Sequence, residues 1–384
     1  MKGFIDLKIG IIGGGQLGKM IAQEAKKMGL FVIILDPTPD SPASEIANKQ
    51  IVSHFNDKGK IEELINQCDI TTFEIEHINT EILKKLENRG KEIYPASRVL
   101  EIIKDKSKQK EFLDEFNIPT SNWKKVDHNA LDDEIPAFPV VQKACRGGYD
   151  GRGVYVIKNK ENIENRLKTE SFLEEYIDFE KELAIMVARN KQGEIKCYPL
   201  VEMEFDEEKN ICDMIIAPAR VDESIYEEAS KIAVKCVENL NGVGVFGIEM
   251  FLTKDKRILV NEIAPRVHNS GHYTIEGCVT SQFEQHLRCI MGLPLGSTEL
   301  IIPTVVINIL GEKNHCGTAD YIGVEETLSI PGVSIHIYGK KEIMPYRKMG
   351  HVTIVDKEID KAIEKAYKVK KTLKAVSKEA KHEE

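Results

Sequence analysis

A glycine-rich turn between an apolar segment and an amphipathic segment is the feature that most constrains this fold. Gly13-Gly14-Gly15-Gln16-Leu17-Gly18 follows the apolar run 8–12 and precedes a helical pattern over 16–28. Glycines at such spacing let a strand turn tightly into a helix, and backbone N–H groups at a helix start attract phosphate. The turn therefore predicts an α/β domain that binds a phosphate near its beginning.

Alternating strand and helix patterns continue to residue 95. Apolar runs at 31–35, 70–74 and 92–94 predict strands, and 61–67 and 79–87 predict helices, which together indicate a parallel sheet with crossover helices. Asp36 follows the second strand, where dinucleotide-binding domains place an acid for a ribose. The turn alone leaves three interpretations open: a nicotinamide cofactor, another phosphorylated ligand, or a purely structural turn.

Two acids, Glu74 and Glu76, follow the strand predicted at 70–74. Residues two apart on an extended segment point to the same side. The carboxyl edge of a parallel sheet is where ligands bind in such domains, so this pair is a candidate site. Two solvated loop acids are the alternative.

A second glycine-rich segment lies in a region of different character. After a helix predicted at 105–116, short β-rich runs occur at 138–143, 154–157 and 172–176. The segment 143–153 between them begins with Lys143 and contains four glycines and two arginines. Backbone N–H donors and fixed positive charges suit a loop that folds over a polyphosphate. The order of residues does not match a Walker A loop.

Acids on apolar strands predict a metal site further along the chain. Glu249 and the pair Asn261-Glu262 interrupt otherwise apolar runs. A buried carboxylate needs a partner, and hard oxygen ligands suit Mg²⁺ bridging ATP phosphates. Buried salt bridges are the alternative. The polar run 265–272 follows at once. Within it, Arg266 is a candidate for holding a small oxyanion, and His268 and Asn269 are candidates for bonding a substrate.

The remaining patterns complete the outline. Helices are predicted at 223–239 and 281–291, strands at 301–310, 334–338 and 351–355, and a Lys/Glu-rich helix from Lys357 onward. The formal net charge of −9 argues against a nucleic-acid partner, and the lack of an apolar run of membrane-spanning length argues against a membrane partner. Eight cysteines scattered singly favour reduced, buried thiols in a cytoplasmic protein.

Five segments in this order resemble the ATP-grasp family, and within it the N5-carboxyaminoimidazole ribonucleotide synthases: 13–20, 147–153, 261–272, 282–288 and 347–351. The resemblance implies a mixed α/β and α+β fold. A Rossmann-like pre-ATP-grasp domain would span 1–100. An ATP-grasp domain would span 101–300, with a lid subdomain at about 125–185. A small β-rich C-terminal domain with a terminal helix would span 301–384.

The same resemblance implies a reaction. ATP and bicarbonate, with Mg²⁺, would carboxylate 5-aminoimidazole ribonucleotide through carboxyphosphate, a step of purine biosynthesis, in a homodimer. The ribonucleotide would be held by Gly15, Gln16, Leu17, Glu74, Glu76, Lys340, Arg347 and Lys348. Catalysis would fall to Lys143, Tyr149, Arg266, His268 and Asn269, and the metal to Glu249 and Glu262.

The implied nucleotide site is the largest set. Glu182 would bind the ribose, and 174–177 would line the adenine largely through the backbone. The full set is Lys106, Lys143, Gly148, Tyr149, Asp150, Gly151, Arg152, Gly153, Glu174, Glu175, Tyr176, Ile177, Glu182, Asn261 and Glu262.

The chain also departs from the family pattern. Lys19 and Lys106 stand where many relatives have arginine, and 201–205 lacks a histidine often seen there. The rival interpretations are another ATP-grasp enzyme, such as a formate-dependent glycinamide ribonucleotide transformylase or a biotin carboxylase, an NAD-dependent dehydrogenase, and a non-catalytic nucleotide-binding module. The segments 266–272 and 347–351 favour the carboxylating synthases.

Overall fold

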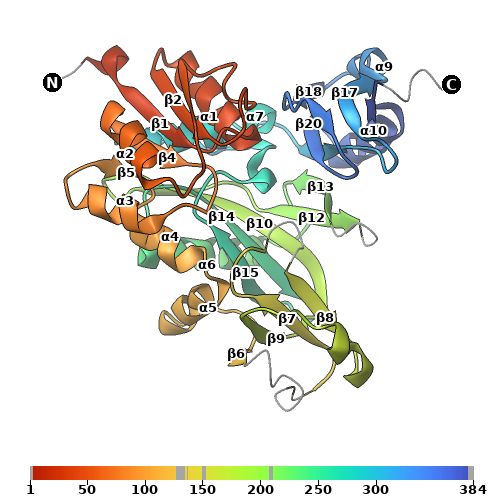
Figure 1. The fold of residues 1–384 in the computed structure, drawn as a ribbon. Helices are drawn as coiled ribbons and strands as arrows, with labels where there is room; N and C mark the ends of the chain where they lie inside the picture. Colours follow the sequence, from red (N-terminus) through yellow and green to blue (C-terminus); the bar gives the residue numbers. More distant parts are fainter. Residues whose placement is uncertain (1–2, 127–134, 136, 149–152, 207–210, 379–384) are drawn as a thin grey trace.

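The computed structural model describes residues 3–126, 135, 137–148, 153–206 and 211–378. Its N-terminal part is a five-stranded parallel sheet in the order β3-β2-β1-β4-β5, flanked by helices (Figure 1). The glycine turn follows β1, and Glu74 follows β4. Since β1 and β4 are parallel neighbours, both lie at one sheet edge. The elements are η1 (Phe4–Asp6), β1 (Lys8–Ile12), α1 (Gln16–Lys27), β2 (Phe31–Asp36), β3 (Lys49–Val52), α2 (Lys58–Gln67), β4 (Ile70–Phe73), α3 (Thr80–Glu87), β5 (Glu92–Ile93) and α4 (Ser97–Ile103).

A nine-stranded sheet forms the centre of the molecule. Its order is β15-β14-β10-β12-β13-β16-β20-β18, and β11 pairs with β10. The sheet runs without a break from the central segment into the C-terminal segment, because β13 pairs with β16. Its elements are β10 (Phe179–Arg189), β11 (Ile195–Cys197), β12 (Val201–Asp206), β13 (Ile211–Ala217), β14 (Gly244–Thr253), β15 (Ile258–Ala264), β16 (Thr304–Leu310), β18 (Val333–Ile337) and β20 (Lys348–Val355).

Helix α6 (Glu223–Leu240) covers one face of this sheet. Its buried residues, Ala229, Ala233 and Val237 among them, recur at helical spacing and pack with Leu183 and Ile185 of β10. An apolar stripe of this kind is what holds a helix against a sheet. Helix α5 (Lys106–Glu115) packs into the same cluster through Phe112 and Leu113.

A four-stranded antiparallel sheet lies in the range proposed for the lid, below the large sheet in Figure 1. Its small core contains Val140, Ile157, Ile163 and Leu173. The second glycine loop connects its strands β7 and β8. Its elements are β6 (Trp123–Val126), β7 (Val140–Ala144), β8 (Val154–Ile157), η3 (Lys160–Asn165) and β9 (Ser171–Glu175), in the order β6-β9-β7-β8.

The terminal helix of the C-terminal segment is shorter than predicted. The helix predicted from Lys357 onward is α10, but it ends at Thr372, and the chain returns as β21 beside β17. The prediction was wrong for 374–377, because Leu373, Ala375 and Val376 are buried in the C-terminal core. The elements are β17 (Gly317–Ile322), α9 (Val324–Leu328), β19 (Glu342–Ile343), α10 (Ile359–Thr372) and β21 (Lys374–Ser377).

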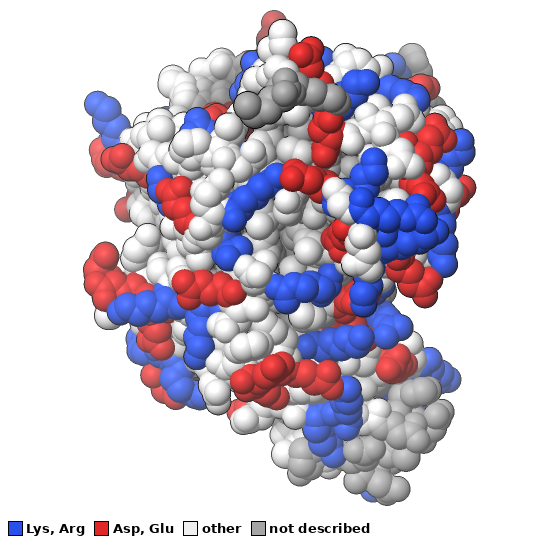
Figure 2. Space-filling model, turned by 90° about the vertical axis from the view of Figure 1, so that its left-hand side faces the viewer, with Lys and Arg blue, Asp and Glu red and all other residues white. Residues whose placement is uncertain are grey.

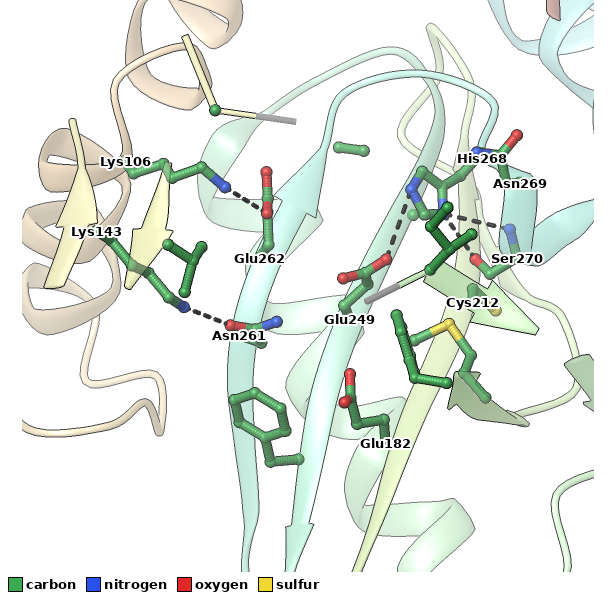
Figure 3. A pocket seen from close by; sticks show the side chains of 18 of the residues that line it. Lys106, Lys143, Glu182, Cys212, Glu249, Asn261, Glu262, His268, Asn269 and Ser270 are labelled. Atoms are coloured by element: carbon green, nitrogen blue, oxygen red, sulfur yellow. Dashed lines mark hydrogen bonds and ion pairs between the residues drawn. The ribbon is translucent and has the colours of Figure 1, made fainter. Parts of the chain in front are cut away.

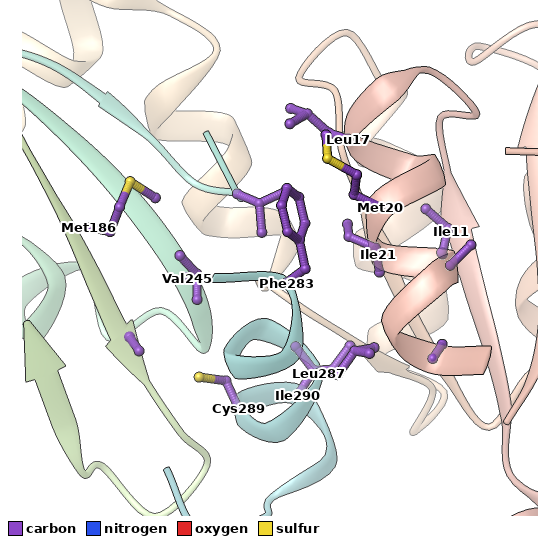
Figure 4. Packing of buried hydrophobic residues seen from close by; sticks show 14 of the residues in the cluster. Ile11, Leu17, Met20, Ile21, Met186, Val245, Phe283, Leu287, Cys289 and Ile290 are labelled. Atoms are coloured by element: carbon purple, nitrogen blue, oxygen red, sulfur yellow. The ribbon is translucent and has the colours of Figure 1, made fainter. Parts of the chain in front are cut away.

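Helices α1 and α8 (Gln282–Met291) join the N-terminal part to the large sheet (Figure 4). Leu17, Met20 and Ile21 of α1 face Phe283 and Leu287 of α8 across a buried apolar contact. Burying such side chains fully stabilises the joint by roughly 2 kcal/mol each. The two parts therefore hold a fixed relation around the space between them.

A buried histidine reinforces this joint. His286 Nε2 lies 2.8 Å from Thr72 Oγ1 of β4, and His286 Nδ1 accepts the Val245 N–H of β14 at 3.1 Å. Burial lowers the pKa of His286 to about 4, so the ring is neutral at pH 7 and can accept that bond.

The surface is mixed in charge. Lys and Arg side chains are interspersed with Asp and Glu on the face in Figure 2. Across the described part of the chain, every helix is too short or too polar to cross a membrane. The eight cysteines are unpaired in this structure, and Cys316 is exposed although it was expected to be buried.

Candidate active site

A cavity of about 590 Å³ opens where the parts of the molecule meet. The N-terminal sheet edge contributes Gln16 and Glu74, the four-stranded sheet contributes Lys143, the large sheet contributes Glu249, and the start of β20 contributes Lys348. Side chains from segments far apart in sequence therefore share one enclosed space (Figure 3).

Two carboxylates occupy the floor of this cavity. Glu249 of β14 and Glu262 of β15 are register partners across the antiparallel pair, and both line the cavity. Glu262 Oε2 accepts a hydrogen bond from Lys106 Nζ at 2.5 Å. Burial favours a higher pKa for Glu262, but the Lys106 ammonium outweighs it, so the pKa lies below its ordinary value. Glu262 is therefore ionised at pH 7.

Glu249 is less well compensated. Burial raises its pKa to about 7, and the neighbouring carboxylates of Glu262 and Glu182 add to the rise. Burial also raises the pKa of Glu182 on β10 to about 7. Glu249 and Glu262 stand opposite each other, and the Asn261 amide lies beside Glu262 in the sequence. Carboxylate and amide oxygens are donors of the kind that a hard divalent cation binds. A cation there would relieve the repulsion that raises the pKa of Glu249.

Two lysines face the same acids from the other side of the cavity. Lys106 begins α5, and Lys143 lies on β7, where its Nζ donates to Asn261 Oδ1 at 2.9 Å (Figure 3). Lys143 also forms an ion pair with Glu174 of β9. The Glu174 side chain is only 4% exposed, and the residue also lines the cavity.

Apolar side chains form the remaining wall. Tyr176 and Ile177 lie where the adenine contact was expected, and Phe179 stacks on Phe251 with ring centroids 4.9 Å apart. The run 201–205, which lacks the histidine, presents Met203 and Phe205 to the cavity. The sequence analysis did not single out the apolar lining residues Val141, Val154, Val156, Phe179, Ile211, Ile215 and Phe251. Their alternation along strands was the available signal.

The polar run after β15 lies at the upper end of the cavity. Arg266 Nη2 pairs with Glu76 Oε1 at 3.0 Å, which links the run to the N-terminal sheet edge. His268 Nε2 lies 3.6 Å from Glu249 Oε1, and its Nδ1 lies 2.8 Å from Ser270 Oγ of η4 (Asn269–Gly271). Among the described residues, neither buried Arg266 Nε nor buried Asn269 Oδ1 has a hydrogen-bond partner. A donor and an acceptor left in this way mark a place for a small polar ligand.

The first glycine turn is organised by two acids. Asp36 Oδ2 accepts the Gly14 N–H at 2.8 Å, and Asp36 Oδ1 accepts the Thr38 N–H at 2.8 Å. Glu74 Oε1 accepts the Gly15 N–H at 2.8 Å. Both oxygens of Asp36 thus accept backbone N–H groups, so Asp36 has a structural role in the turn.

The turn also requires its last glycine. A Cβ on Gly18 would lie 2.4 Å from the Gly13 carbonyl oxygen, closer than any side chain can stand to a backbone atom. Gln16 and Leu17, at the start of α1, are the residues of the turn that line the cavity. Gly15 lies behind them and supports Glu74.

Most of the predicted site residues line this one cavity: Gln16, Leu17, Glu74, Glu76, Lys106, Lys143, Gly148, Glu174, Glu175, Tyr176, Ile177, Glu182, Glu249, Asn261, Glu262, Arg266, His268, Asn269 and Lys348. Gly153, the last residue of the second glycine-rich segment, is not among the lining residues. Tyr149, Asp150, Gly151 and Arg152 lie outside the described residues.

The predicted ribonucleotide contacts of the C-terminal segment are only partly brought together. Lys348 lines the cavity, and Lys340 Nζ donates to the Lys348 carbonyl oxygen at 2.6 Å behind it. Arg347 Nη1 donates to the Glu342 carbonyl oxygen at 2.7 Å, away from the lining residues. Lys340 and Arg347 thus support the segment in this structure without lining the cavity.

Three family models match the chain in order. They describe a ribonucleotide synthetase preATP-grasp domain at residues 7–106, an ATP-grasp domain at 111–283 and a phosphoribosylaminoimidazole carboxylase C-terminal domain at 304–365. An N5-carboxyaminoimidazole ribonucleotide synthase of Bacillus subtilis is 40% identical over 363 residues, which cover 93% of each chain. The chain belongs to the N5-carboxyaminoimidazole ribonucleotide synthase family. The predicted family and the predicted ATP-grasp fold class are both confirmed.

Relatives outside this synthase group are longer. A chloroplastic phosphoribosylaminoimidazole carboxylase of Vigna aconitifolia is 39% identical over 363 residues, which cover 92% of this chain and 65% of that protein. The chain therefore spans about two thirds of the plant relative and nearly all of the bacterial synthase.

Solved structures of the family superimpose closely. The synthetase of Thermotoga maritima has a TM-score of 0.90 and 57% identity, covering 97% of this chain and 100% of that one. A synthase from Aspergillus clavatus, solved with ADP and 5-aminoimidazole ribonucleotide, has a TM-score of 0.87 and 33% identity over 96% of this chain and 99% of that one.

Proposed function

We propose that this chain carboxylates 5-aminoimidazole ribonucleotide with bicarbonate and ATP, giving N5-carboxyaminoimidazole ribonucleotide, ADP and phosphate. The observation that carries the proposal is the convergence of Glu249, Glu262, Lys143 and Arg266 in one cavity. Paired acids, a lysine and an arginine are what a phosphoryl transfer to a small oxyanion needs. The names of the relatives, and the ligands of the Aspergillus clavatus structure, support the same reaction.

The nucleotide would occupy the part of the cavity that is lined by Ile177, Phe251 and Glu182. Apolar walls around Ile177 and Phe251 suit the adenine, and Glu182 suits a ribose hydroxyl. Lys106 and Lys143 would bind the triphosphate. Glu249 and Glu262 would hold Mg²⁺, which, when bound, neutralises charge on the phosphates.

The first chemical step is carried by position and charge. A bicarbonate oxygen attacks the γ-phosphorus, the bond to the β-phosphate oxygen breaks, and ADP leaves, so carboxyphosphate forms. Arg266 and Asn269, with their unpartnered buried atoms, would orient bicarbonate, and Lys143 would meet the charge that develops on the transferred group.

The second step joins the two halves of the cavity. The exocyclic amine attacks the carboxyl carbon of carboxyphosphate, or of the CO₂ that carboxyphosphate releases. The N–C bond forms, the bond between the carboxyl group and phosphate breaks, and the amine proton passes to the leaving phosphate. Gln16, Leu17 and Lys348 lie where they would hold the ribonucleotide, and Glu76 fixes Arg266 between the two sites through their 3.0 Å ion pair. Enclosure between the sheets would protect carboxyphosphate from water.

Three further expectations belong to this proposal. The reaction is a step of purine biosynthesis, the protein is cytoplasmic, and it works as a homodimer. Size-exclusion chromatography with light scattering measures the last of these. We also propose the domain limits 1–100, 101–300 and 301–384 with the lid near 125–185.

A coupled ADP-release assay tests the reaction. Each of ATP, bicarbonate and 5-aminoimidazole ribonucleotide is omitted in turn from the full mixture, and ADP is expected only when all three are present. Turnover with formate and glycinamide ribonucleotide at a comparable rate would favour the transformylase and contradict the proposal.

A further inference from the structure

Lys143, which faces the proposed nucleotide site, forms an ion pair with the buried carboxylate of Glu174. Lys143 Nζ lies against Glu174, so the positive charge of one would cancel the negative charge of the other. A neutral pair would attract a triphosphate weakly. A second lysine on the far side of Glu174 resolves this.

Lys110 is that second lysine. It lies on α5, one turn after Lys106, and its side chain is only 3% exposed. Its Nζ lies 2.9 Å from Glu174 Oε2, 2.6 Å from Thr120 Oγ1 and 2.8 Å from Ser121 Oγ. Lys110 is not among the site residues predicted from the sequence, and it does not line the cavity.

The hydrogen-bond directions favour the protonated form of Lys110. Thr120 Oγ1 donates its hydrogen to the Val260 carbonyl oxygen at 2.7 Å, and Ser121 Oγ donates its hydrogen to Glu174 Oε2 at 2.9 Å. Both hydroxyls can therefore only accept from Lys110 Nζ, and the third partner is a carboxylate. Three acceptors around one nitrogen match the three N–H donors of an ammonium ion. Burial lowers the pKa of Lys110, and the neighbouring Glu174 carboxylate opposes this shift and favours the charged form.

Glu174 is ionised between the two lysines. Burial would raise its pKa, but Lys143 and Lys110 outweigh the burial and lower the pKa to about 2. The group Lys110-Glu174-Lys143 thus holds two positive charges and one negative charge. Lys143 and Glu174 line the cavity, and Lys110 lies behind Glu174, so the group places a net charge of one positive unit beside the cavity.

We propose that Lys110 is a positioning residue for ATP, which acts through Glu174 to keep the charge of Lys143 available to the triphosphate. The inference rests on the proposed function, because it assumes that Lys143 meets ATP. Replacing Lys110 by methionine would leave the neutral pair Glu174-Lys143. Replacing Glu174 by glutamine as well would restore one positive unit, since a glutamine oxygen can still accept from Lys143.

The test compares ATP with adenosine, which carries no phosphate, by calorimetric titration of the full-length protein. Lys110→Met is expected to weaken ATP binding at least about tenfold and adenosine binding less than about twofold. The double variant Lys110→Met/Glu174→Gln is expected to recover part of the loss and to bind ATP at least about threefold more tightly than Lys110→Met does. Lys108→Met, at an exposed position on the same helix, is the matched control and binds as the parent does.

The outcomes distinguish an electrostatic role of Lys110 from a purely structural role. Equal loss of ATP and adenosine, or no recovery in the double variant, would mean that Lys110 only holds α5 in place, and would overturn the inference. ATP binding by Lys110→Met within twofold of the parent would overturn it as well. Lys110→Gln, which keeps hydrogen bonds without the charge, replaces Lys110→Met if thermal unfolding shows that the latter does not fold. A parent chain that binds no ATP would instead refute the proposed function.

Discussion

Glu249 and Glu262 stand directly opposite each other on β14 and β15, so two carboxylates are held side by side in one buried place. Only one of them has a lysine within hydrogen-bond distance in the described structure: Glu262 accepts from Lys106, whereas Glu249 has its pKa raised to about 7. A buried carboxylate without a nearby positive charge destabilises the folded protein. Such carboxylates are typical of binding and catalytic sites.

Replacement of Glu262 tests the metal assignment. Glu262→Gln keeps the shape of the side chain but removes a charge that would hold Mg²⁺ against the triphosphate. We expect turnover to fall at least about 100-fold, measured by ADP release with all substrates at saturation. Glu227→Gln, on the exposed face of α6, should turn over as the parent does. Activity near the parental level in Glu262→Gln would remove Glu262 from the metal site.

Replacement of Glu249 should separate stability from activity. Glu249→Gln removes a buried carboxylate that repels Glu262 and Glu182, so without metal and nucleotide the free energy of unfolding should rise by on the order of 1 kcal/mol. Turnover should fall as it does in Glu262→Gln. Urea unfolding and ADP release measure the two effects, and a variant that is both less stable and fully active would contradict this account.

Arg266 should act on bicarbonate more than on ATP. Its planar group pairs with Glu76 through Nη2, while buried Nε has no partner among the described residues. Lys at this position keeps the charge but cannot serve both places at once. Arg266→Lys should raise the KM for bicarbonate about tenfold and change the KM for ATP less than about twofold. Initial rates with each substrate varied in turn give both constants; equal increases would argue against a bicarbonate contact.

The buried histidines predict a loss of stability in acid. His272 and His351 stack with ring centroids 4.4 Å apart, beside His336, Tyr338 and Lys348. Burial holds the pKa values of His272 and His351 well below 6.5, and the neighbouring histidines lower them further. Below about pH 6.5, His272 and His351 are protonated in the unfolded chain but stay neutral in the folded chain. The free energy of unfolding should therefore fall as the pH drops below about 6.5.

A single substitution isolates this effect. His351→Gln should reduce the slope of unfolding free energy against pH between pH 7 and pH 5 by up to about 1.4 kcal/mol per pH unit. Urea unfolding at several pH values measures the slope, and His54→Gln, at an exposed position, is the control. An unchanged slope in His351→Gln would mean that His351 takes up its proton in the folded protein.

The sequence was sufficient for the elements that carry strong local signals. The run of isoleucines at 8–12 and the glycines after it predict a strand and a turn, because strand pairing and tight turning depend on few neighbours. Residues 374–377 had no such signal. They follow a lysine-rich helix, and only their pairing with β17 and the burial of Ala375 and Val376 make them a strand.

The site likewise contains residues that could be predicted from the sequence and residues that could not. Glu249 and Glu262 were predictable because a carboxylate on an apolar strand needs a partner. Lys110 was not, because it follows Lys104, Lys106 and Lys108 in one short lysine-rich segment, and such segments are usually exposed to solvent. Its role depends on Glu174 of β9, which is distant in the sequence and comes within 2.9 Å of Lys110 only in the folded chain. The binding of the Gly15 N–H by Glu74 was hidden for the same reason.

A crystal structure with Mg²⁺ and a non-hydrolysable ATP analogue tests the central claim most directly. The account predicts the triphosphate between Lys143 and the acids Glu249 and Glu262, with the metal bound to both carboxylates. A triphosphate bound elsewhere, such as at the glycine turn 13–18, would contradict it.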